Sequence, residues 1–278
     1  MASDLQTKPP TSESYILTYP APFVVLVTIN REKQMNSIPS YAHWEAESIF
    51  TWFDNEPNLR VAIITGAGKK AFCAGQDLIE QATFKVKPPP APLRRHPSSG
   101  FAGLSRRVGK KPVIAAVNGF ALGGGFEICL NCDMVVAAPN ASFGLPEATV
   151  GLYAGAGGLP RIVRNCGLQI GSEIAMTGRR LTAQEALGFH LINKISKTQD
   201  TVIDEAVDMA NKIAGLSPDA IIVTRHGLRE AWETGSVERA FQRTADRYGQ
   251  ALAEGPNMKI GLDAFARKEK PRWVPSKI

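Results

Sequence analysis

Short apolar runs separated by turn signals predict buried strands in the first two thirds of the chain. These runs are rich in Val, Ile and Ala and cover residues 23–29, 61–66, 113–117 and 134–138. Runs of this length bounded by turn residues are typical of strands buried in a sheet. Residues 40–53 instead carry their large apolar side chains at helical spacing, which predicts an amphipathic helix. Strands that alternate with helices favour an α/β fold with a mostly parallel sheet.

The spacing of the hydrophobic residues changes near residue 200. No strand is predicted after Ile195, whereas residues 201–214, 217–232 and 236–253 carry apolar stripes at helical spacing. Residues 1–14 are rich in Pro, Ser, Thr and Lys, which predicts a flexible leader. We therefore expect a leader at 1–14, an α/β core at 15–200 and a C-terminal helical region at 201–278.

A proline-rich segment interrupts the predicted core at residues 85–100, and it predicts a loop without regular structure. A loop of that length in a compact domain is usually functional or mobile.

Composition narrows the classes of protein that this chain can represent. Hydrophobic residues make up 44% and charged residues 21%, which is ordinary globular usage. The net charge of +6 suits a polyanionic small molecule and is too small to identify a nucleic acid as partner. The four cysteines form no disulfide framework in a chain this long, which favours a reducing compartment. Neither a membrane-spanning run nor a secretory signal is present, so no membrane insertion is expected.

The last three residues, Ser276-Lys277-Ile278, resemble the small–basic–Leu peroxisomal signal, with Ile in place of Leu. They predict a peroxisomal location. The alternative is a chance tripeptide on a solvated tail, in which case the cytoplasm or the mitochondrial matrix is expected.

Three glycine-containing segments stand out, at residues 71–78, 118–127 and 151–158. The first two follow predicted strands, and the third lies just beyond residues 144–147. At strand-to-helix turns, glycines leave backbone N–H groups accessible and without an acceptor, and they let a ligand approach closely. Two such N–H groups from different turns can converge on one oxygen and form an oxyanion hole. Taken alone, each segment is more typical of a tight turn where a helix packs on the sheet. No dinucleotide or nucleoside-triphosphate fingerprint is present.

Two carboxylates, Glu127 and Glu147, follow these strands at the end where open α/β sheets place their sites. They are candidates for a paired acid and base. Alternatively, each is a residue favoured at the start of a helix. Cys129 and Cys132 have no second Cys or His pair at metal spacing, so they indicate buried packing and no metal site is expected.

Taken together, these segments resemble the crotonase superfamily, the enoyl-CoA hydratase/isomerase family. The resemblance runs from about Val24 to Pro271 and rests on six segments in order: 30–38, 72–78, 112–119, 123–133, 143–158 and 261–271. It implies a spiral of ββα repeats with a C-terminal helical region, assembled as a homotrimer or homohexamer. It also implies an acyl-CoA substrate, with CoA part of that substrate and no separate cofactor.

The resemblance also implies roles for particular residues. The backbone N–H groups of Gln76 and Gly124 would hold the thioester oxygen. The CoA-binding residues would be Met35, Ala74, Gln76, Asp77, Leu78, Ile79 and Gly124. Hydratases of the family keep glutamates at both positions matching Glu127 and Glu147, whereas many isomerases keep only the second. Glu127 would deprotonate water for attack at Cβ, and Glu147 would deliver the proton to Cα of a 2-enoyl-CoA.

Some residues depart from the family pattern near the expected acyl pocket. Gln76 replaces the small residue common in hydratases. An isomerase, or a dehydratase acting on a specialised acyl-CoA of secondary metabolism, is therefore an alternative activity. An RNA-binding member of the family is an alternative of another class, but it should show a dense Lys/Arg stripe. The short cluster at residues 106–111 is too small for that; it indicates a solvated face or a phosphate contact.

Overall fold

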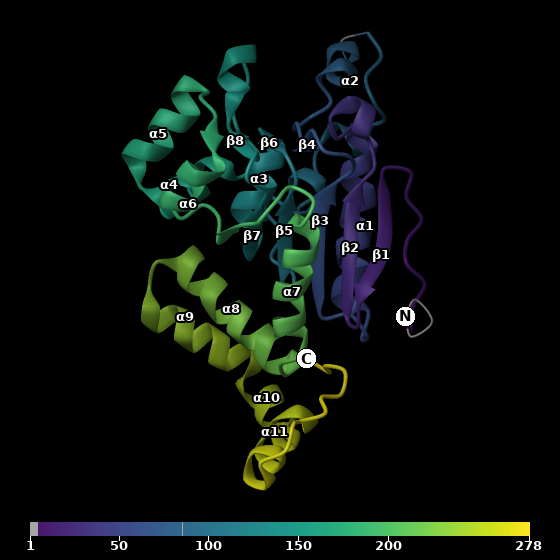
Figure 1. The fold of residues 1–278 in the computed structure, drawn as a ribbon, viewed down its shortest axis with the longest axis vertical. Coiled ribbons are helices and arrows are strands. Elements are labelled where there is room, and N and C mark those ends of the chain that lie inside the picture. Colours follow the sequence, from purple (N-terminus) through teal and green to yellow (C-terminus); the bar gives the residue numbers. More distant parts are fainter. Residues whose placement is uncertain (1–4, 85) are drawn as a thin grey trace.

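The computed structural model describes residues 5–84 and 86–278, and within these ranges the strands form two sheets (Figure 1). The six-stranded sheet has the order β1 (Tyr15–Ala21), β2 (Val24–Ile29), β3 (Val61–Gly66), β5 (Val113–Val117), β7 (Met134–Ala137) and β10 (Lys194–Ile195). The four-stranded sheet has the order β4 (Ala71–Cys73), β6 (Phe120–Leu122), β8 (Ser142–Gly144) and β9 (Leu181–Thr182).

The chain winds between the two sheets as a spiral. The consecutive pairs β3–β4, β5–β6 and β7–β8 each add one parallel strand to each sheet. The α3 helix (Gly124–Asn131) follows β6 directly. The other core helices are α1 (Ser40–Asn55), α2 (Leu78–Thr83), α4 (Gly158–Cys166), α5 (Leu168–Thr177) and α6 (Ala183–Gly188). The expected α/β spiral is confirmed.

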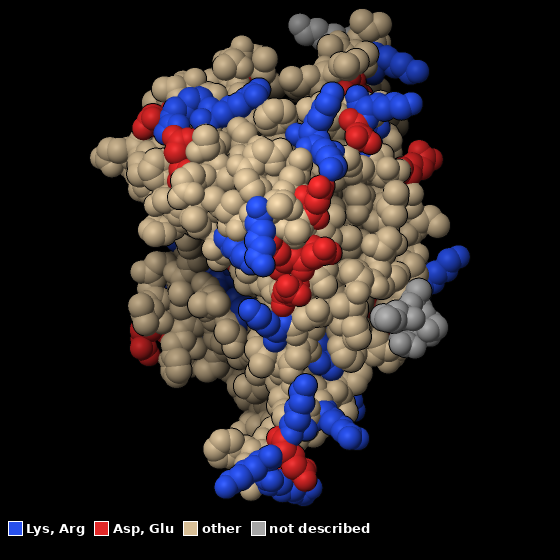
Figure 2. Space-filling model, in the orientation of Figure 1, with Lys and Arg blue, Asp and Glu red and all other residues tan. Residues whose placement is uncertain are grey.

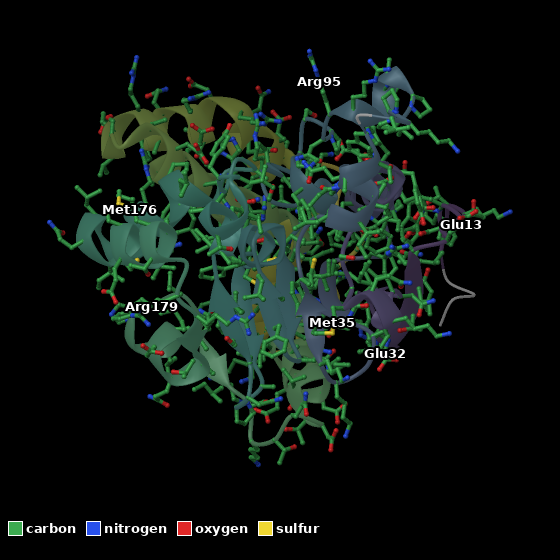
Figure 3. All side chains as sticks on the ribbon, turned by 90° about the horizontal axis from the view of Figure 1, so that it is seen from above. Glu13, Glu32, Met35, Arg95, Met176 and Arg179 are labelled. Carbon is green, nitrogen blue, oxygen red and sulfur yellow. The ribbon has the colours of Figure 1, made fainter. Side chains whose placement is uncertain are left out.

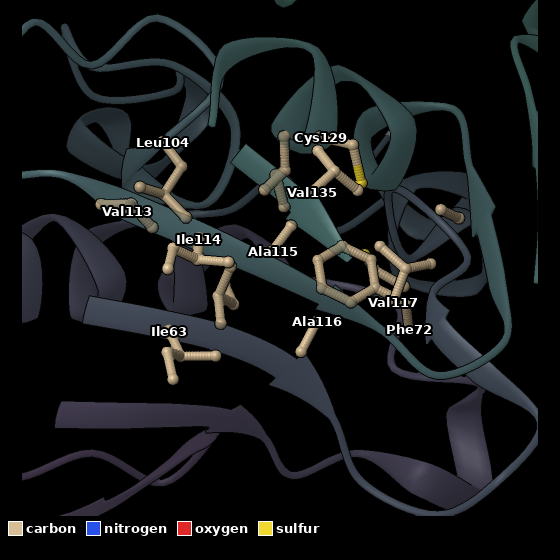
Figure 4. Packing of buried hydrophobic residues seen from close by; sticks show 14 of the residues in the cluster. Ile63, Phe72, Leu104, Val113, Ile114, Ala115, Ala116, Val117, Cys129 and Val135 are labelled. Carbon is tan, nitrogen blue, oxygen red and sulfur yellow. The ribbon is translucent and has the colours of Figure 1, made fainter. Parts of the chain in front are cut away.

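The uniformly apolar runs form the central strands, as predicted. Every residue of β3 and β5 is buried, and Ile63 pairs with Ile114 across the two strands. Figure 4 shows this part of the core, with Phe72 and Cys129 beside the side chains of the β5 strand, such as Val117. Cys129 is 2% exposed, and burial raises its thiol pKa. The cysteine therefore contributes packing.

The first strand, β1, is absent from the sequence prediction. It pairs antiparallel with β2 through a turn at Pro22 and Phe23. Its middle residues are half-buried or exposed, because it lies at the edge of the sheet. An edge strand needs no apolar run, so its sequence lacks the signal of the buried strands.

Residues 5–14, part of the expected flexible leader, are held against α1 by two acidic residues. The Thr7 N–H donates to Glu56 Oε2 at 2.7 Å, and the Ser12 hydroxyl donates to Glu45 Oε2 at 2.8 Å. The rest of the expected leader, residues 1–4, lies outside the described residues.

A short 3₁₀ helix, Ala91–Arg94, lies within the segment 85–100 that was expected to lack regular structure. Proline in its first turn fixes φ at a helical value, which explains why a proline-rich segment forms it. Residue 85 itself lies outside the described residues.

The core extends beyond the boundary expected near residue 200. The α7 helix (Val202–Ala214) buries Val202, Ala206, Ala210 and Ala214 in the same cluster as the strands. In Figure 1 the α8 (Pro218–Thr234) and α9 (Val237–Thr244) helices lie beside α7, and α10 (Gln250–Glu254) and α11 (Pro256–Arg267) lie below it, all away from β4, β6 and β8. None of the helices in the described residues is long and apolar enough to span a lipid bilayer.

Asp133 joins the spiral to α8 through a largely buried ion-pair network. Its carboxylate accepts from Arg225 Nε at 3.0 Å, from Arg229 Nη2 at 2.9 Å and from the Val113 N–H at 2.9 Å. The two arginines and the Val113 N–H hold the pKa of Asp133 below its usual value despite burial.

Replacement of Asp133 by Ala leaves two cations without their carboxylate, one of them, Arg225, nearly fully buried. We expect Asp133→Ala to lower the free energy of unfolding by about 3–5 kcal/mol, measured by urea denaturation. Asp263→Ala, which breaks the exposed pair with Lys259, is the matched control and should change stability little. Equal unfolding midpoints for the two variants would contradict this account of the network.

Candidate active site

A cavity of about 430 Å³ opens where the glycine-containing turns meet. Its wall includes the start of α3, the turn between β4 and α2, and the loop around residues 93–96. The 3₁₀ segment Pro146–Val150, residues 152–156, the start of α1 and Phe101 also line it. Glu127 and Glu147 both line this cavity, together with Gln76 and Gly124.

Two backbone N–H groups, those of Gln76 and Gly124, lie close together in this wall and have no acceptor among the residues that the structure describes. Ile38 bridges to the 75–77 turn by donating to the Gly75 carbonyl and accepting from the Asp77 N–H, so the Gln76 N–H between them faces the other way. Gly124 is the first residue of α3, and its N–H has no acceptor within the helix. A Cβ at Gly75 would lie 3.4 Å from the Gly124 nitrogen, which brings the two turns together.

The glycines of the 123–125 turn are required by close packing. A Cβ at Gly125 would lie 2.1 Å from the Cys73 carbonyl oxygen, and a Cβ at Gly124 would lie 2.6 Å from the Phe101 ring. Gly123 has φ +55°, which favours glycine. The absence of side chains therefore lets α3 begin directly against the 73–76 turn.

Glu127 is buried in the first turn of α3, at 3% exposure. Its Oε1 accepts from the N–H groups of Ala156 at 2.9 Å and Gly158 at 2.8 Å. Burial, together with the negative charge of Glu147, raises the pKa of Glu127 to about 7 although these two hydrogen bonds lower it. A carboxyl group with this pKa can give or take a proton near neutral pH.

Glu147 faces the same cavity from the 3₁₀ segment Pro146–Val150. Its Oε1 would be 3.1 Å from a Cβ on Gly123, so the carboxylate lies against the turn that exposes the Gly124 N–H. Its Oε2 is buried and has no hydrogen-bond partner among the described residues. Burial raises the pKa of Glu147. A buried, unpartnered carboxylate oxygen is suited to take a proton from a bound molecule.

The residues that the resemblance assigned to CoA binding fall into two groups. Ala74 and Leu78 line the cavity, as do Gln76 and Gly124. Met35, Asp77 and Ile79 are not among its lining residues.

The three that lie outside have other surroundings. Asp77 caps the N-terminus of α2 and pairs with Arg31 at 2.7 Å. Ile79 is 83% exposed. Figure 3 shows Met35 beside Glu32 and well apart from Arg95, which borders the cavity.

Several cavity residues were not singled out from the sequence. His43 lies on the buried face of α1, and His96 lies in the loop after the Ala91–Arg94 turn. Their imidazole nitrogens lie 3.0 Å and 3.4 Å, respectively, from Gln76 Oε1. In the sequence these histidines lie far from Gln76 and from each other, and no spacing rule connects them.

Two members of the basic cluster at residues 106–111, Arg107 and Lys111, are buried. These two form neither a solvated face nor a phosphate contact. Arg107 pairs with Asp54 at 2.5 Å, and Lys111 Nζ donates to the carbonyls of Phe53 at 2.9 Å and Glu56 at 2.6 Å. On the face drawn in Figure 2, Lys and Arg lie interspersed with Asp and Glu. That face shows no dense basic stripe of the kind that RNA binding would need.

Known proteins resemble this chain in both sequence and fold. The family model described as enoyl-CoA hydratase/isomerase matches residues 22–275. The chain is 44% identical to a mevalonyl-coenzyme A hydratase of Beauveria bassiana over 98% of both chains. It is 37% identical to a carnitinyl-CoA dehydratase of Proteus mirabilis, over 90% of this chain and 94% of that one. The crystal structure of an enoyl-CoA hydratase from Bacillus anthracis superposes with a TM-score of 0.83 at 33% identity, covering 95% of this chain and all of the other.

Proposed function

Since the chain belongs to the enoyl-CoA hydratase/isomerase family, we propose that it removes water reversibly from a branched 3-hydroxyacyl-CoA such as mevalonyl-CoA. Its relatives are CoA hydratases and dehydratases, and the chain is an enzyme of this type. The substrate rests on the 44% identity to a mevalonyl-coenzyme A hydratase across nearly the whole of both chains. Mevalonyl-CoA carries a methyl group and a hydroxyl on C3 and a second hydroxyl at the end of the acyl chain.

The mechanism rests on one observation: the carboxyl groups of Glu127 and Glu147 lie in the same cavity as two backbone N–H groups that have no acceptor among the described residues. In the dehydration direction, the Glu147 carboxylate takes the proton from Cα. The negative charge that develops on the thioester oxygen is stabilised by the N–H groups of Gln76 and Gly124. Glu127 gives its proton to the Cβ hydroxyl, which leaves as water while the Cα–Cβ double bond forms. Hydration runs through the same steps in reverse.

The charge around the cavity supports a CoA thioester. Arg94 and Arg95 line the side formed by the 93–96 loop. Their positive charge suits the phosphates of CoA, as does the net charge of +6. The acidic residues among the lining residues are Glu127 and Glu147, so negative charge is confined to the reacting end.

A panel of thioesters tests the proposed reaction. The purified protein is incubated with mevalonyl-CoA, 3-hydroxybutyryl-CoA and carnitinyl-CoA, and the absorbance of the conjugated thioester is followed. We expect the largest kcat/KM for mevalonyl-CoA. A preference for carnitinyl-CoA would contradict the proposed substrate, and failure to dehydrate any of the three would contradict the proposed reaction.

The pH dependence of this reaction follows from the two raised pKa values. In both directions the active form of the enzyme holds a single proton on the two carboxyl groups. That proton is on Glu127 at the start of dehydration and on Glu147 at the start of hydration. Since the pKa of Glu127 is about 7, that proton is lost as the pH rises above about 7. We expect kcat/KM to fall about tenfold per pH unit on the alkaline side in both directions. A profile that stays flat between pH 7 and 9 would contradict this assignment.

Assembly as a homotrimer or homohexamer stays part of the proposal. An apolar hollow of about 300 Å³ lies between the 145–154 segment and the α4 and α5 helices. Leu168 and Met176 on its border are 60% and 79% exposed, which supports burial by a second copy. Light scattering behind size exclusion should give three or six times the chain mass. A monomer at micromolar concentration would contradict it.

We also propose peroxisomal import through Ser276-Lys277-Ile278. The tripeptide lies in a hollow beside Lys110, whose Nζ is 3.5 Å from the Ile278 carbonyl oxygen. The full chain fused behind a fluorescent protein should co-localise with a peroxisomal marker, and the Lys277→Glu variant should not. Diffuse fluorescence of the unmodified fusion would contradict import.

A further inference from the structure

The side chain of Gln76 is fixed by a buried histidine that the proposed mechanism does not use. His43 is 2% exposed, and its ring packs at 4.6 Å from Phe101 and 4.4 Å from His96. Its Nδ1 accepts a hydrogen bond from the Ala102 N–H at 3.0 Å. Because a backbone N–H only donates, His43 Nδ1 carries no proton and the ring is neutral. Burial also lowers the pKa of His43 to about 3.

This tautomer determines which way the Gln76 amide lies. With Nδ1 unprotonated, the proton of neutral His43 is on Nε2, which is 3.0 Å from Gln76 Oε1. The Nε2 of His96 lies 3.4 Å from the same oxygen. The side-chain oxygen of Gln76 is therefore the acceptor of the histidine hydrogen bonds. The NH₂ group of the same amide points away from them and is free to donate elsewhere. No acceptor for this NH₂ group is found among the residues that the structure describes, and Gln76 lines the cavity.

We propose that the Gln76 NH₂ group donates a hydrogen bond to a neutral oxygen on the acyl chain, such as the terminal hydroxyl of a 3,5-dihydroxy-3-methyl thioester, and that His43 is the positioning residue for this subsite. The inference rests on the proposed function and deepens it by naming the feature of the acyl group that is selected. The backbone N–H of the same residue is the proposed donor to the thioester oxygen. The side chain therefore lies within the length of a short acyl chain from the reacting carbons.

The chemistry of this subsite favours a hydroxyl over a cation. An amide NH₂ donates to oxygen and cannot bind a quaternary ammonium group. The loop that carries His96 also carries Arg94 and Arg95, and their positive charge disfavours a quaternary ammonium group there. The subsite therefore fits mevalonyl-CoA better than carnitinyl-CoA.

Two variants separate this role from a general effect on the site. Gln76→Leu removes the NH₂ group and keeps the backbone N–H. His43→Asn keeps an oxygen near the position of Nδ1 as acceptor for the Ala102 N–H but no longer reaches Gln76. Gln242→Leu makes the same chemical change at an exposed residue of α9, outside the cavity, and is the matched control.

The readout is the ratio of kcat/KM for mevalonyl-CoA to kcat/KM for its analogue without the terminal hydroxyl, 3-hydroxy-3-methylpentanoyl-CoA. We expect the unmodified enzyme to prefer mevalonyl-CoA by about 10- to 100-fold, because the analogue leaves the amide donor unpaired. The ratio should fall close to one in Gln76→Leu. In His43→Asn it should fall because the KM for mevalonyl-CoA rises, and in Gln242→Leu it should stay unchanged.

The outcomes of this experiment separate the two proposals. A ratio that is unchanged in Gln76→Leu, or that is near one in the unmodified enzyme, overturns the subsite while the dehydration reaction stands. Absence of turnover with both thioesters in the unmodified enzyme contradicts the proposed function itself. A His43→Asn ratio equal to that of the unmodified enzyme overturns the positioning role of the histidine.

Discussion

Glu147→Gln and Glu127→Gln are each expected to reduce kcat/KM for dehydration by about 10²- to 10⁴-fold, the usual contribution of a positioned acid or base. The amide that replaces the Glu147 carboxylate cannot take the Cα proton, and the amide that replaces the Glu127 carboxyl cannot supply one to the leaving hydroxyl. Both changes preserve side-chain volume, and both replace a carboxyl whose pKa is raised by burial, so folding should be retained.

Glu238→Gln is the matched control, because Glu238 is an exposed glutamate on α9 away from the cavity. The measurement is steady-state dehydration of mevalonyl-CoA, with circular dichroism to compare folding. Activity within about twofold of the unmodified enzyme in either cavity variant would remove that glutamate from the mechanism.

Gly124→Ala is expected to lower kcat by about 10²- to 10³-fold, which corresponds to the loss of one oxyanion-hole donor. The added Cβ would lie 2.6 Å from the Phe101 ring, so the start of α3 must move and carry the Gly124 N–H with it. The backbone conformation itself is not the obstacle, since Gly124 is not among the residues with positive φ.

A second substitution tests whether this steric contact is the cause. Phe101→Leu removes the ring that the new Cβ meets. The double variant Gly124→Ala, Phe101→Leu should regain a large part of the activity relative to Gly124→Ala alone, measured as kcat for mevalonyl-CoA. If the double variant is no more active than Gly124→Ala, displacement of the N–H by the Phe101 contact is not the explanation.

The sequence predicted those elements of the fold whose pattern of hydrophobic residues depends on burial alone. The β3 and β5 strands begin and end where their apolar runs do, because both of their faces are covered. The edge strand β1 lacks such a run, and α7 continues the core with small residues such as Ala206 and Ala210. Neither the pairing of an edge strand nor the choice of helix that covers a sheet is encoded in local periodicity.

The candidate site was predicted in part, for a related reason. Glycine turns and glutamates after strands are local signals, and Gln76, Gly124, Glu127 and Glu147 do line one cavity. The contact between His43 and Gln76 joins residues 33 positions apart and depends on how α1 packs against the spiral. A single histidine on the buried face of an amphipathic helix gives no sign of such a partner. Met35, Asp77 and Ile79 were assigned by resemblance alone, and the cavity does not include them.

The central claim is that two carboxylates divide the proton transfers at Cα and Cβ, and exchange of the Cα proton in D₂O measures this division directly. With mevalonyl-CoA, we expect Glu127→Gln to lose dehydration but still to exchange the Cα proton for deuterium, because Glu147 and the two N–H groups remain. Glu147→Gln should lose both dehydration and exchange. Exchange that persists in Glu147→Gln and vanishes in Glu127→Gln would contradict the assigned roles.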